Sequence, residues 1–412
     1  MAKYIHTIVS FLILLSLSNY AIAADDNFTV DGNKYVVTSR SSLRIVGMSV
    51  PKNGKVVIPY EVTYNTKTMD VNEIGNNENF FDEPEKVISL TIPASISAIQ
   101  NFKSNGHTHN HSFEKCVNLK TIVFEDSWQT LFIPSNRYDE TIYYSCFYNC
   151  PLEELYIGRN LSHDGWYCAP FHYKKSLKNV VIGKCVYKIE DCLFEGCKNI
   201  EKIDLPNVEN IGGCAFLDCE KLKQVNLYNS LKVIGGQSFK RTAIKTIDLP
   251  SSLETIGSEA MYGCKSLESI TIPDKVKEIP SWAFYDCSKL TQLTIGKSVT
   301  KILKGAFYST DLRKIYSRIS SPSKCTLNSA FSSGTYANAI LYVPEGTIEL
   351  YRNSKEWELF FNIQEGSITE IHGVMDDERD NSDNKLYNLH GIKIKAPKGL
   401  YIKNGKKYIH RK

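Results

Sequence analysis

Three histidines at alternate positions are the first residues in this chain that could do chemistry. His107, His109 and His111 would point to one side of an extended segment and could share a metal ion. A protein metal site needs further ligands, and no Asp, Glu or Cys stands at a fixed spacing from the run to supply them. We therefore expect a solvated loop here, and we predict neither a metal nor another cofactor.

A second group contains the residue types of a Cys-His nucleophilic site. It comprises His163, Asp164, Cys168 and His172, which fall in a repeat corner and its insertion. No oxyanion-hole or glycine-rich signature accompanies them. The sequence therefore does not indicate nucleophilic catalysis at this position.

Paired carboxylates could cleave glycosidic bonds if they projected from one face of the protein. Glu154, Asp204 and Asp248 are the acidic residues on the strand positions expected to face outward, and they are scattered. We predict that the protein is not an enzyme. A polysaccharide-acting enzyme remains an alternative, because parallel β-solenoid enzymes exist.

The elements that would position any site come from an internal repeat in residues 194–307. Four units have a Phe-x-x-Cys corner, at residues 194–197, 216–219, 261–264 and 284–287, with Met261 in place of Phe once, then an apolar residue and a strand-like triplet. The period is 22 to 23 residues, too short for a unit to bury its own apolar face, so neighbouring units must stack on it. The sequence predicts a repeat solenoid with one short strand per coil and with Phe and Cys on the opposite wall. The triplets are residues 203–205, 225–227, 247–249, 270–272 and 293–295.

One repeat, residues 283–295, reads Ala-Phe-Tyr-Asp-Cys-Ser-Lys-Leu-Thr-Gln-Leu-Thr-Ile. This pattern resembles the BspA-type leucine-rich repeat of bacterial cell-surface proteins, and the resemblance covers roughly residues 28–366. The resemblance implies a leucine-rich repeat fold and adhesion to host or bacterial macromolecules.

The chain divides into five predicted segments. Residues 1–23 have a basic start, a short apolar run and a small-residue end, which indicates a cleaved signal peptide and export. Residues 24–80 form an N-terminal β cap that includes a hairpin around an Asp-Gly turn. Residues 81–366 form the leucine-rich repeat solenoid, whose first clear strand lies at 88–93, and a short helix over 348–361 closes it. An acidic linker, 367–384, and a basic C-terminal β tail, 385–412, follow; the tail resembles those of exported Bacteroides-type proteins.

The distribution of charge argues against some partners. The net charge is +4, but the tail holds most of the excess, so the repeat body is close to neutral. Nucleic acid would require a basic stripe along the solenoid, so we predict no nucleic-acid partner. Outside the signal peptide no apolar run is long enough to cross a bilayer, so we also predict no transmembrane segment.

The 12 cysteines admit two interpretations. Six lie at the repeat corner, where a small buried side chain is required, so we expect buried thiols. Cys192 and Cys214 share another repeat position. Disulfides between neighbouring coils are the alternative, because adjacent strands are close enough to be bridged. Cys146, Cys150 and Cys168 lie among the insertions and are the favoured pair-formers. The corner cysteines are Cys116, Cys150, Cys197, Cys219, Cys264 and Cys287.

The predicted function is non-covalent binding of a host or bacterial surface protein or glycan. Tyr and Trp in loops on a rigid scaffold dominate recognition energies, and small polar groups fill the outward strand positions. Packing within the insertions and plain strand solubility are the competing accounts of these residues. A structural component of an envelope assembly is the alternative function. The candidate ligand-binding residues are Trp128, Tyr143, Tyr144, Tyr156, Trp166, Tyr167, Asp204, Asn226 and Asp248.

Overall fold

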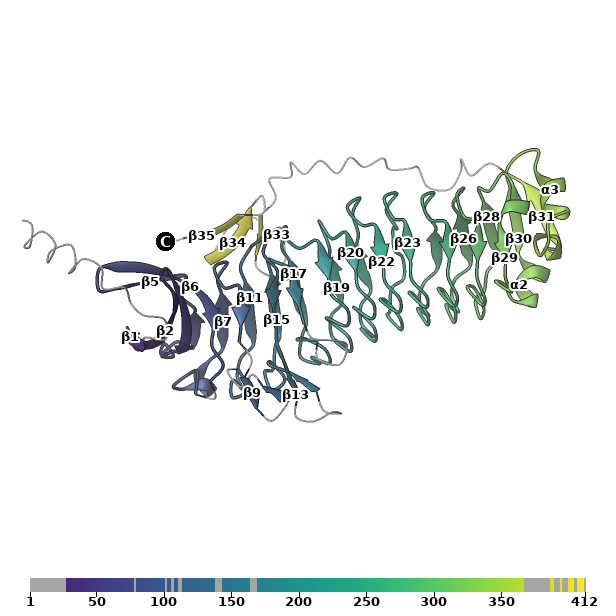
Figure 1. The fold of residues 1–412 in the computed structure, drawn as a ribbon. Coiled ribbons are helices and arrows are strands. Elements are labelled where there is room, and N and C mark those ends of the chain that lie inside the picture. Colours follow the sequence, from purple (N-terminus) through teal and green to yellow (C-terminus); the bar gives the residue numbers. More distant parts are fainter. Residues whose placement is uncertain are drawn as a thin grey trace, which may run out of the picture.

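The chain folds into a stack of coils along one axis, as the computed structural model shows (Figure 1). The structure describes residues 27–366 except 78, 101, 105–106, 110–112, 138–142 and 164–168, and towards the C-terminus it describes 386–388, 393–394, 399–403 and 406–410. The N-terminal strands lie at one end of the stack, and α2 (Ser333–Asn338) and α3 (Ile348–Arg352) lie at the other. The predicted repeat solenoid is confirmed.

The N-terminal strands form a sheet that continues into the stack. β1 (Asn27–Val30) and β2 (Asn33–Ser39) pair antiparallel around Asp31 and Gly32, whose φ values are 49° and 80°. Positive φ at both positions suits a two-residue Asp-Gly turn, so the predicted hairpin is confirmed. β3 (Ser42–Gly47) pairs with β2 and then, in parallel, with β6 (Lys67–Ile74). β6 in turn pairs with β5 (Glu61–Tyr64) and with β8 of the solenoid.

One wall of the solenoid is a ladder of short parallel strands, which we call the strand face. It comprises sheets of five, two and five strands. Its first strand lies one coil earlier than the sequence indicated, because residues 55–57 pair with residues 89–91. In chain order the strands are β4 (Lys55–Val57), β7 (Ser89–Ile92), β11 (Thr121–Phe124), β15 (Glu154–Ile157), β17 (Asn179–Ile182), β19 (Lys202–Asp204), β21 (Gln224–Asn226), β24 (Ser269–Thr271), β26 (Gln292–Ile295), β28 (Lys314–Ser317), β30 (Ile340–Val343) and β31 (Asn362–Glu365).

The strand predicted around Ile247 does not form. Ile247 itself is buried, like the central residues of the neighbouring strands, but residues 246–248 are in no sheet. One backbone bond beside them joins this coil to the next, from Glu268 N to Lys245 O at 3.0 Å. An apolar side chain can reach the core over a range of backbone positions, whereas a ladder requires both backbones to be in register. The repeat pattern detects the first condition and not the second.

A second wall is made of two-residue parallel strands. Each strand has one buried apolar residue, and in each pair with a full register these residues of successive coils lie side by side, as Ile211 does with Ile234. The strands are β8 (Ala98–Ile99), β12 (Leu131–Phe132), β16 (Leu161–Ser162), β18 (Lys188–Ile189), β20 (Asn210–Ile211), β22 (Val233–Ile234), β23 (Thr255–Ile256), β25 (Glu278–Ile279), β27 (Lys301–Ile302) and β29 (Thr326–Leu327).

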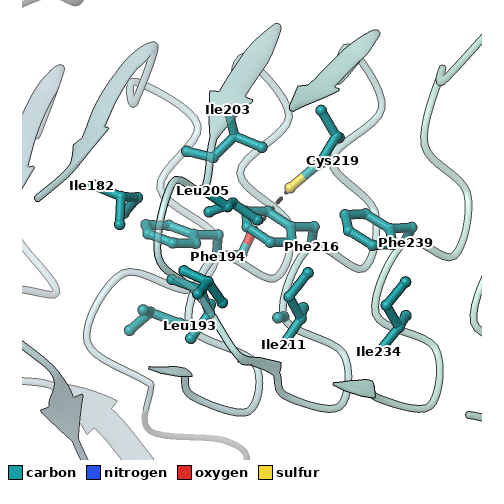
Figure 2. Close-up of a cluster of buried hydrophobic side chains, with 14 of the residues drawn as sticks. Ile182, Leu193, Phe194, Ile203, Leu205, Ile211, Phe216, Cys219, Ile234 and Phe239 are labelled. Carbon is teal, nitrogen blue, oxygen red and sulfur yellow. Dashed lines mark hydrogen bonds between the residues drawn. The ribbon is translucent and has the colours of Figure 1, made fainter. Parts of the chain in front are cut away.

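The third wall is the Phe-x-x-Cys corner, whose phenylalanines stack in a column that Met261 interrupts once. Phe216 lies 5.4 Å from Phe194 and 5.5 Å from Phe239, ring centre to ring centre, with interplanar angles of 17° and 1°. Figure 2 shows this column between the aliphatic side chains of the two strand walls. Stacked phenylalanines fill the core at most levels, and Met261 takes their place at one, as the repeat predicts.

The corner cysteines are buried thiols, and those from Cys150 onward hydrogen-bond to the preceding coil. Cys219 Sγ donates to the carbonyl oxygen of Phe194 at 3.1 Å, and Cys197 Sγ donates to that of Phe171 at 3.0 Å (Figure 2). All six are at most 2% exposed. Cys146 and Cys150, the favoured pair-formers, are also buried thiols, and Cys168 lies outside the described residues.

Lys174 occupies the cysteine position of the coil that begins at Phe171. Its side chain is buried, and Nζ donates to the carbonyl oxygens of Phe147, Tyr148 and Cys150, the last two at 2.6 and 3.2 Å. Burial lowers the pKa of the Lys174 ammonium. One cation thus satisfies three carbonyls where a thiol satisfies one.

Lys174→Ala is expected to lower the free energy of unfolding by about 2–4 kcal/mol, because three carbonyl oxygens lose a charged donor. Lys174→Cys is the matched variant, and it should recover part of this loss since a thiol at this position can donate to the Phe carbonyl. Urea unfolding followed by circular dichroism measures both. Equal stability of Lys174→Ala and the wild type would show that the three bonds contribute nothing net.

The C-terminal end of the stack is closed by residues from two short helices. α3 is followed by the 3-10 turn η4 (Trp357–Leu359), and Tyr351 and Trp357 are fully buried with ring centres 5.1 Å apart. The expectation of one helix over 348–361 is wrong, because Leu350 and Phe361 face solvent and β31 then extends the strand face. Two further 3-10 turns are η1 (Pro84–Lys86) and η3 (Pro322–Lys324).

Three other groups of strands lie outside the two ladders. The hairpins β9 (Phe102–Ser104) with β10 (His107–His109) and β13 (Ser135–Arg137) with β14 (Tyr143–Ser145) belong to the insertions, and β10 lies beside β13. The C-terminal segment forms a four-stranded sheet of β32 (Leu386–Asn388), β33 (Lys393–Ile394), β34 (Gly399–Lys403) and β35 (Lys406–His410). No helix in the described part of the chain is long and apolar enough to cross a membrane.

Candidate functional site

The predicted insertion aromatics lie in different surroundings. Trp128 lies on the loop between β11 and β12, with 70% of its surface exposed. Tyr156 was expected to face outward but is only 6% exposed, and its hydroxyl donates to Asp126 Oδ1 at 2.6 Å. Asp126 belongs to the same loop as Trp128, residues 125–130, and the contact ties Tyr156 into the turn. Tyr156 is therefore not available to a ligand in this conformation.

The predicted polar residues of the strand face lie on neighbouring coils. Asp204 pairs in register with Asn226, and Asp204 Oδ1 also accepts a hydrogen bond from Tyr228 at 2.8 Å. Asn226 Oδ1 accepts from Gln224 at 3.1 Å. Asp248 is exposed on the coil that lacks a strand. These side chains lie on one face, and the first two bond mainly to their own neighbours.

Other candidate residues fall outside the described part of the chain. Trp166 and Tyr167 lie there, as do Asp164 and His111. Tyr143 and Tyr144 belong to β14, and His107 and His109 belong to β10, but the side chains of these four also lie outside it.

The described members of the Cys-His group have structural partners. The Nε2 atom of His163 lies 2.9 Å from the carbonyl oxygen of Asp191. His172 contacts the carbonyl oxygen of Ala169 through Nδ1, and burial lowers the pKa of its imidazole. Among the described residues no group of three His, Cys, Asp or Glu side chains is arranged to hold a metal ion.

A surface groove lies at the corner wall, and none of the predicted site residues lines it. Lys240, Glu259, Tyr262, Trp282 and Tyr285 line it, and it holds a volume of about 370 Å³. The lining side chains come from three successive coils. Two positions of the repeat supply them: the residue after the corner Phe or Met (Lys240, Tyr262, Tyr285) and the residue two before it (Glu259, Trp282). We call this the aromatic groove.

The aromatic side chains of the groove are held by contacts along the stack. Tyr262 and Tyr285 are stacked, with ring centres 4.9 Å apart and an interplanar angle of 19°. Trp282 is 40% exposed, and its indole lies against Gly305 of the next coil. A Cβ atom on Gly305 would come within 2.7 Å of Trp282 Cδ1, so glycine is needed there for the indole to lie in this place.

The charges of the groove neutralise one another. Lys240 Nζ lies 2.5 Å from Glu259 Oε2 and 4.5 Å from the centre of the Tyr262 ring, an ion pair and a cation-π contact at once. Gln237 Nε2 donates to the same carboxylate oxygen at 3.2 Å. Both charged side chains are less than a quarter exposed. The groove therefore offers aromatic surface and polar groups with little net charge.

Backbone strain at the groove reflects the repeat rather than the site. Glu259 and Trp282 have φ values of 58° and 56°, in the left-handed region that favours glycine. The same position has similar values at Cys192, Cys214 and Gln237, which do not line the groove. The turn into every one of these corners requires this conformation.

Sequence reasoning missed the groove because it examined strand positions and insertions. The signal was present in the repeat. Tyr262, Tyr285 and Tyr308 follow the corner residue in three successive units, and Trp282 stands two residues before the corner Phe284. Comparing every column of the repeat, corner columns included, would have found it.

Comparison with known proteins agrees with this architecture. The family model of the BspA type leucine rich repeat region matches in 6 copies, over residues 72–222, 140–268 and 209–338. No curated protein matches the chain.

Among solved structures, a leucine-rich repeat protein from Bacteroides ovatus is 21% identical over 82% of this chain and 100% of its own, with a TM-score of 0.44. A leucine rich cell surface protein from Faecalibacterium prausnitzii is 18% identical over 85% and 97%, with a TM-score of 0.35. The pneumococcal vaccine antigen PcpA is 18% identical over 84% and 100%, with a TM-score of 0.36. Because the family matches together span more than half of the sequence, the chain belongs to the BspA-type leucine-rich repeat family.

Proposed function

We propose that this chain is an exported, surface-associated binding protein that recognises a protein or glycan partner without catalysis, in the manner of an adhesin. Membership of the BspA-type family supports a surface role. The aromatic groove is the observation that carries the proposal for where the partner binds.

The composition of the groove suits recognition. Trp and Tyr offer large, rigid contact area at little entropic cost, and they are the residues in which binding energy concentrates. Trp282 exposes 40% of its surface beside the stacked pair Tyr262 and Tyr285. The nearby Lys240 and Glu259 supply donors and an acceptor for hydrogen bonds to a partner. A sugar ring or an extended peptide could lie across these three coils.

The test is a glycan and extracellular-matrix protein array probed with the full chain, followed by affinity measurement for each hit. Trp282→Ala is expected to weaken binding about 30-fold or more, the loss typical of a central aromatic contact. Trp128→Ala is the matched control, since Trp128 is also an exposed tryptophan, 70% exposed, but lies on another part of the stack.

The possible outcomes separate the alternatives. Loss of binding in Trp128→Ala alone would move the site to the insertion loops that the sequence predicted. Unchanged binding in both variants would show that neither Trp282 nor Trp128 contacts the partner. Absence of any hit, together with ordered self-assembly of the purified chain, would favour a structural component of an envelope assembly.

A further inference from the structure

Cys192 and Cys214 lie side by side on successive coils. Each stands two residues before a corner phenylalanine, and their φ values are 56° and 55°. Backbone bonds on both sides fix the register: Cys192 N donates to Gly213 O at 2.8 Å, and Phe194 N donates to Ala215 O at 2.9 Å. Backbones bonded in this parallel, strand-like way lie about 4.8 Å apart, within the Cα separations that a disulfide spans.

The two thiols contact each other rather than the backbone. The Cys192 and Cys214 side chains lie in one cluster, and they are 1% and 5% exposed. With Ala169 and the partly buried Leu217 they form a small apolar cluster separate from the main core. Cys214 Sγ also lies 3.4 Å from Gln237 Oε1, to which it can donate.

The corner cysteines of the same two coils differ in this respect. Cys197 and Cys219 also occupy one repeat position, but each thiol donates to a phenylalanine carbonyl oxygen of the preceding coil, at 3.0 and 3.1 Å. A disulfide between them would remove both buried hydrogen bonds and leave each of these carbonyl oxygens with one donor fewer, at an energetic cost. The pair at 192 and 214 has no such backbone bonds to lose.

We propose that Cys192 and Cys214 are joined by a disulfide that cross-links two successive coils of the solenoid. The N-terminal segment that predicts export would bring the chain into an oxidising compartment, where such bonds form. The oxidant is a disulfide-bearing oxidoreductase of that compartment.

The reaction is thiol–disulfide exchange in two steps. The Cys214 thiolate attacks one sulfur of the oxidoreductase disulfide, which forms a mixed disulfide and expels one oxidoreductase thiolate. The Cys192 thiolate then attacks the Cys214 sulfur and expels the other. The two protons lost by the cysteines go to the two oxidoreductase thiolates, so the cysteines are oxidised and the oxidoreductase is reduced. Exchanging the two cysteines in this sequence of steps leaves the balance unchanged.

The experiment maps disulfides in the full chain after its secretion into an oxidising compartment of an expression host. Free thiols are alkylated in denaturant without reductant, and the chain is then digested with chymotrypsin. Phe194 lies between Cys192 and Cys197, and Phe216 lies between Cys214 and Cys219, so this protease separates the two candidate pairs, whereas trypsin leaves each coil's cysteines on one peptide. Mass spectrometry should find the Cys192 peptide linked to the Cys214 peptide.

A stability comparison gives a second measurement. Reductant should lower the melting temperature of the wild type and of the matched variant Cys219→Ser. It should leave the melting temperature of Cys214→Ser unchanged. Complete alkylation of Cys192 and Cys214 in the secreted wild type would overturn the proposal. So would a link between the Cys197 and Cys219 peptides in place of the expected one.

Discussion

Phe216→Ala is expected to lower the free energy of unfolding by about 3–5 kcal/mol, the range for removing a fully buried aromatic side chain. Phe216 is 0% exposed and lies between Phe194 and Phe239 in the aromatic column. Each coil is stabilised only by its two neighbours, so the cavity would weaken both of its interfaces. The shift of the urea midpoint, with the slope of the transition, measures the loss.

Phe361→Ala is the control for this variant. The same chemical change is made where the ring is 89% exposed, so stability should change by less than about 0.5 kcal/mol. A loss below about 1 kcal/mol at Phe216 would mean that the neighbouring coils close over the cavity. The stacked corner phenylalanines would then contribute less to the free energy of unfolding than their burial indicates.

Arg159→Met should lower the free energy of unfolding by about 3 kcal/mol or more, because the Arg159 guanidinium is the donor for several buried carbonyl oxygens. Arg159 is 0% exposed; Nη1 donates to Ile96 O at 2.5 Å, Nη2 donates to Pro93 O, and Nε donates to Glu125 O at 3.3 Å. Burial lowers the pKa of Arg159 to about 10. The group nevertheless stays charged at neutral pH.

Arg159 lies in a connection that is shorter than the corresponding connections of the two preceding coils. Its coil passes from β15 to β16 in residues 158–160, whereas the two preceding coils use residues 93–97 and 125–130. The guanidinium lies in this shorter connection and reaches Glu125 O one coil away and Ile96 O and Pro93 O two coils away. Its planar fork of donors suits several acceptors at once.

Arg313→Met is the matched control, because Arg313 pairs with Asp311 on the surface, where its side chain is 72% exposed. Exposed pairs of this kind contribute about 0–1 kcal/mol. Lysine at position 159 keeps the charge but not the fork, so Arg159→Lys should fall between the wild type and Arg159→Met. If Arg159→Met and Arg313→Met lower the free energy of unfolding equally little, the buried guanidinium does not stabilise the fold.

The repeat allowed most of the fold to be predicted, because each recurring residue has one physical task. Phe194 and Phe216 stack, Cys219 fits a tight corner, and the apolar residues of each triplet point inward. These tasks depend on residue type and spacing alone. The missing strand around Ile247 could not be predicted in this way, since its side chain obeys the pattern while its backbone lacks the ladder.

The candidate sites were harder to predict, because exposure depends on what neighbouring loops do. Tyr156 occupies an outward column, yet the loop carrying Asp126 binds its hydroxyl and covers it. The aromatic groove combines side chains from three coils, and Trp282 can lie where it does only because the next coil has Gly305. Such arrangements depend on pairs of columns, and no single column of the repeat reveals them.

The coil between Phe239 and Phe284 has a mechanical consequence. At this level Met261 interrupts the aromatic column, residues 246–248 leave the strand face, and β23 and β25 belong to different sheets. The corner bonds continue, as from Met261 N to Ala283 O at 2.8 Å. Both ladders also break between the coil of β15 and β16 and the coils that carry β18 and β19. A loaded stack bends first where its ladders are broken, so the solenoid should bend at these levels rather than uniformly. The aromatic groove spans the break beside Met261, so a bound partner would stiffen the stack there.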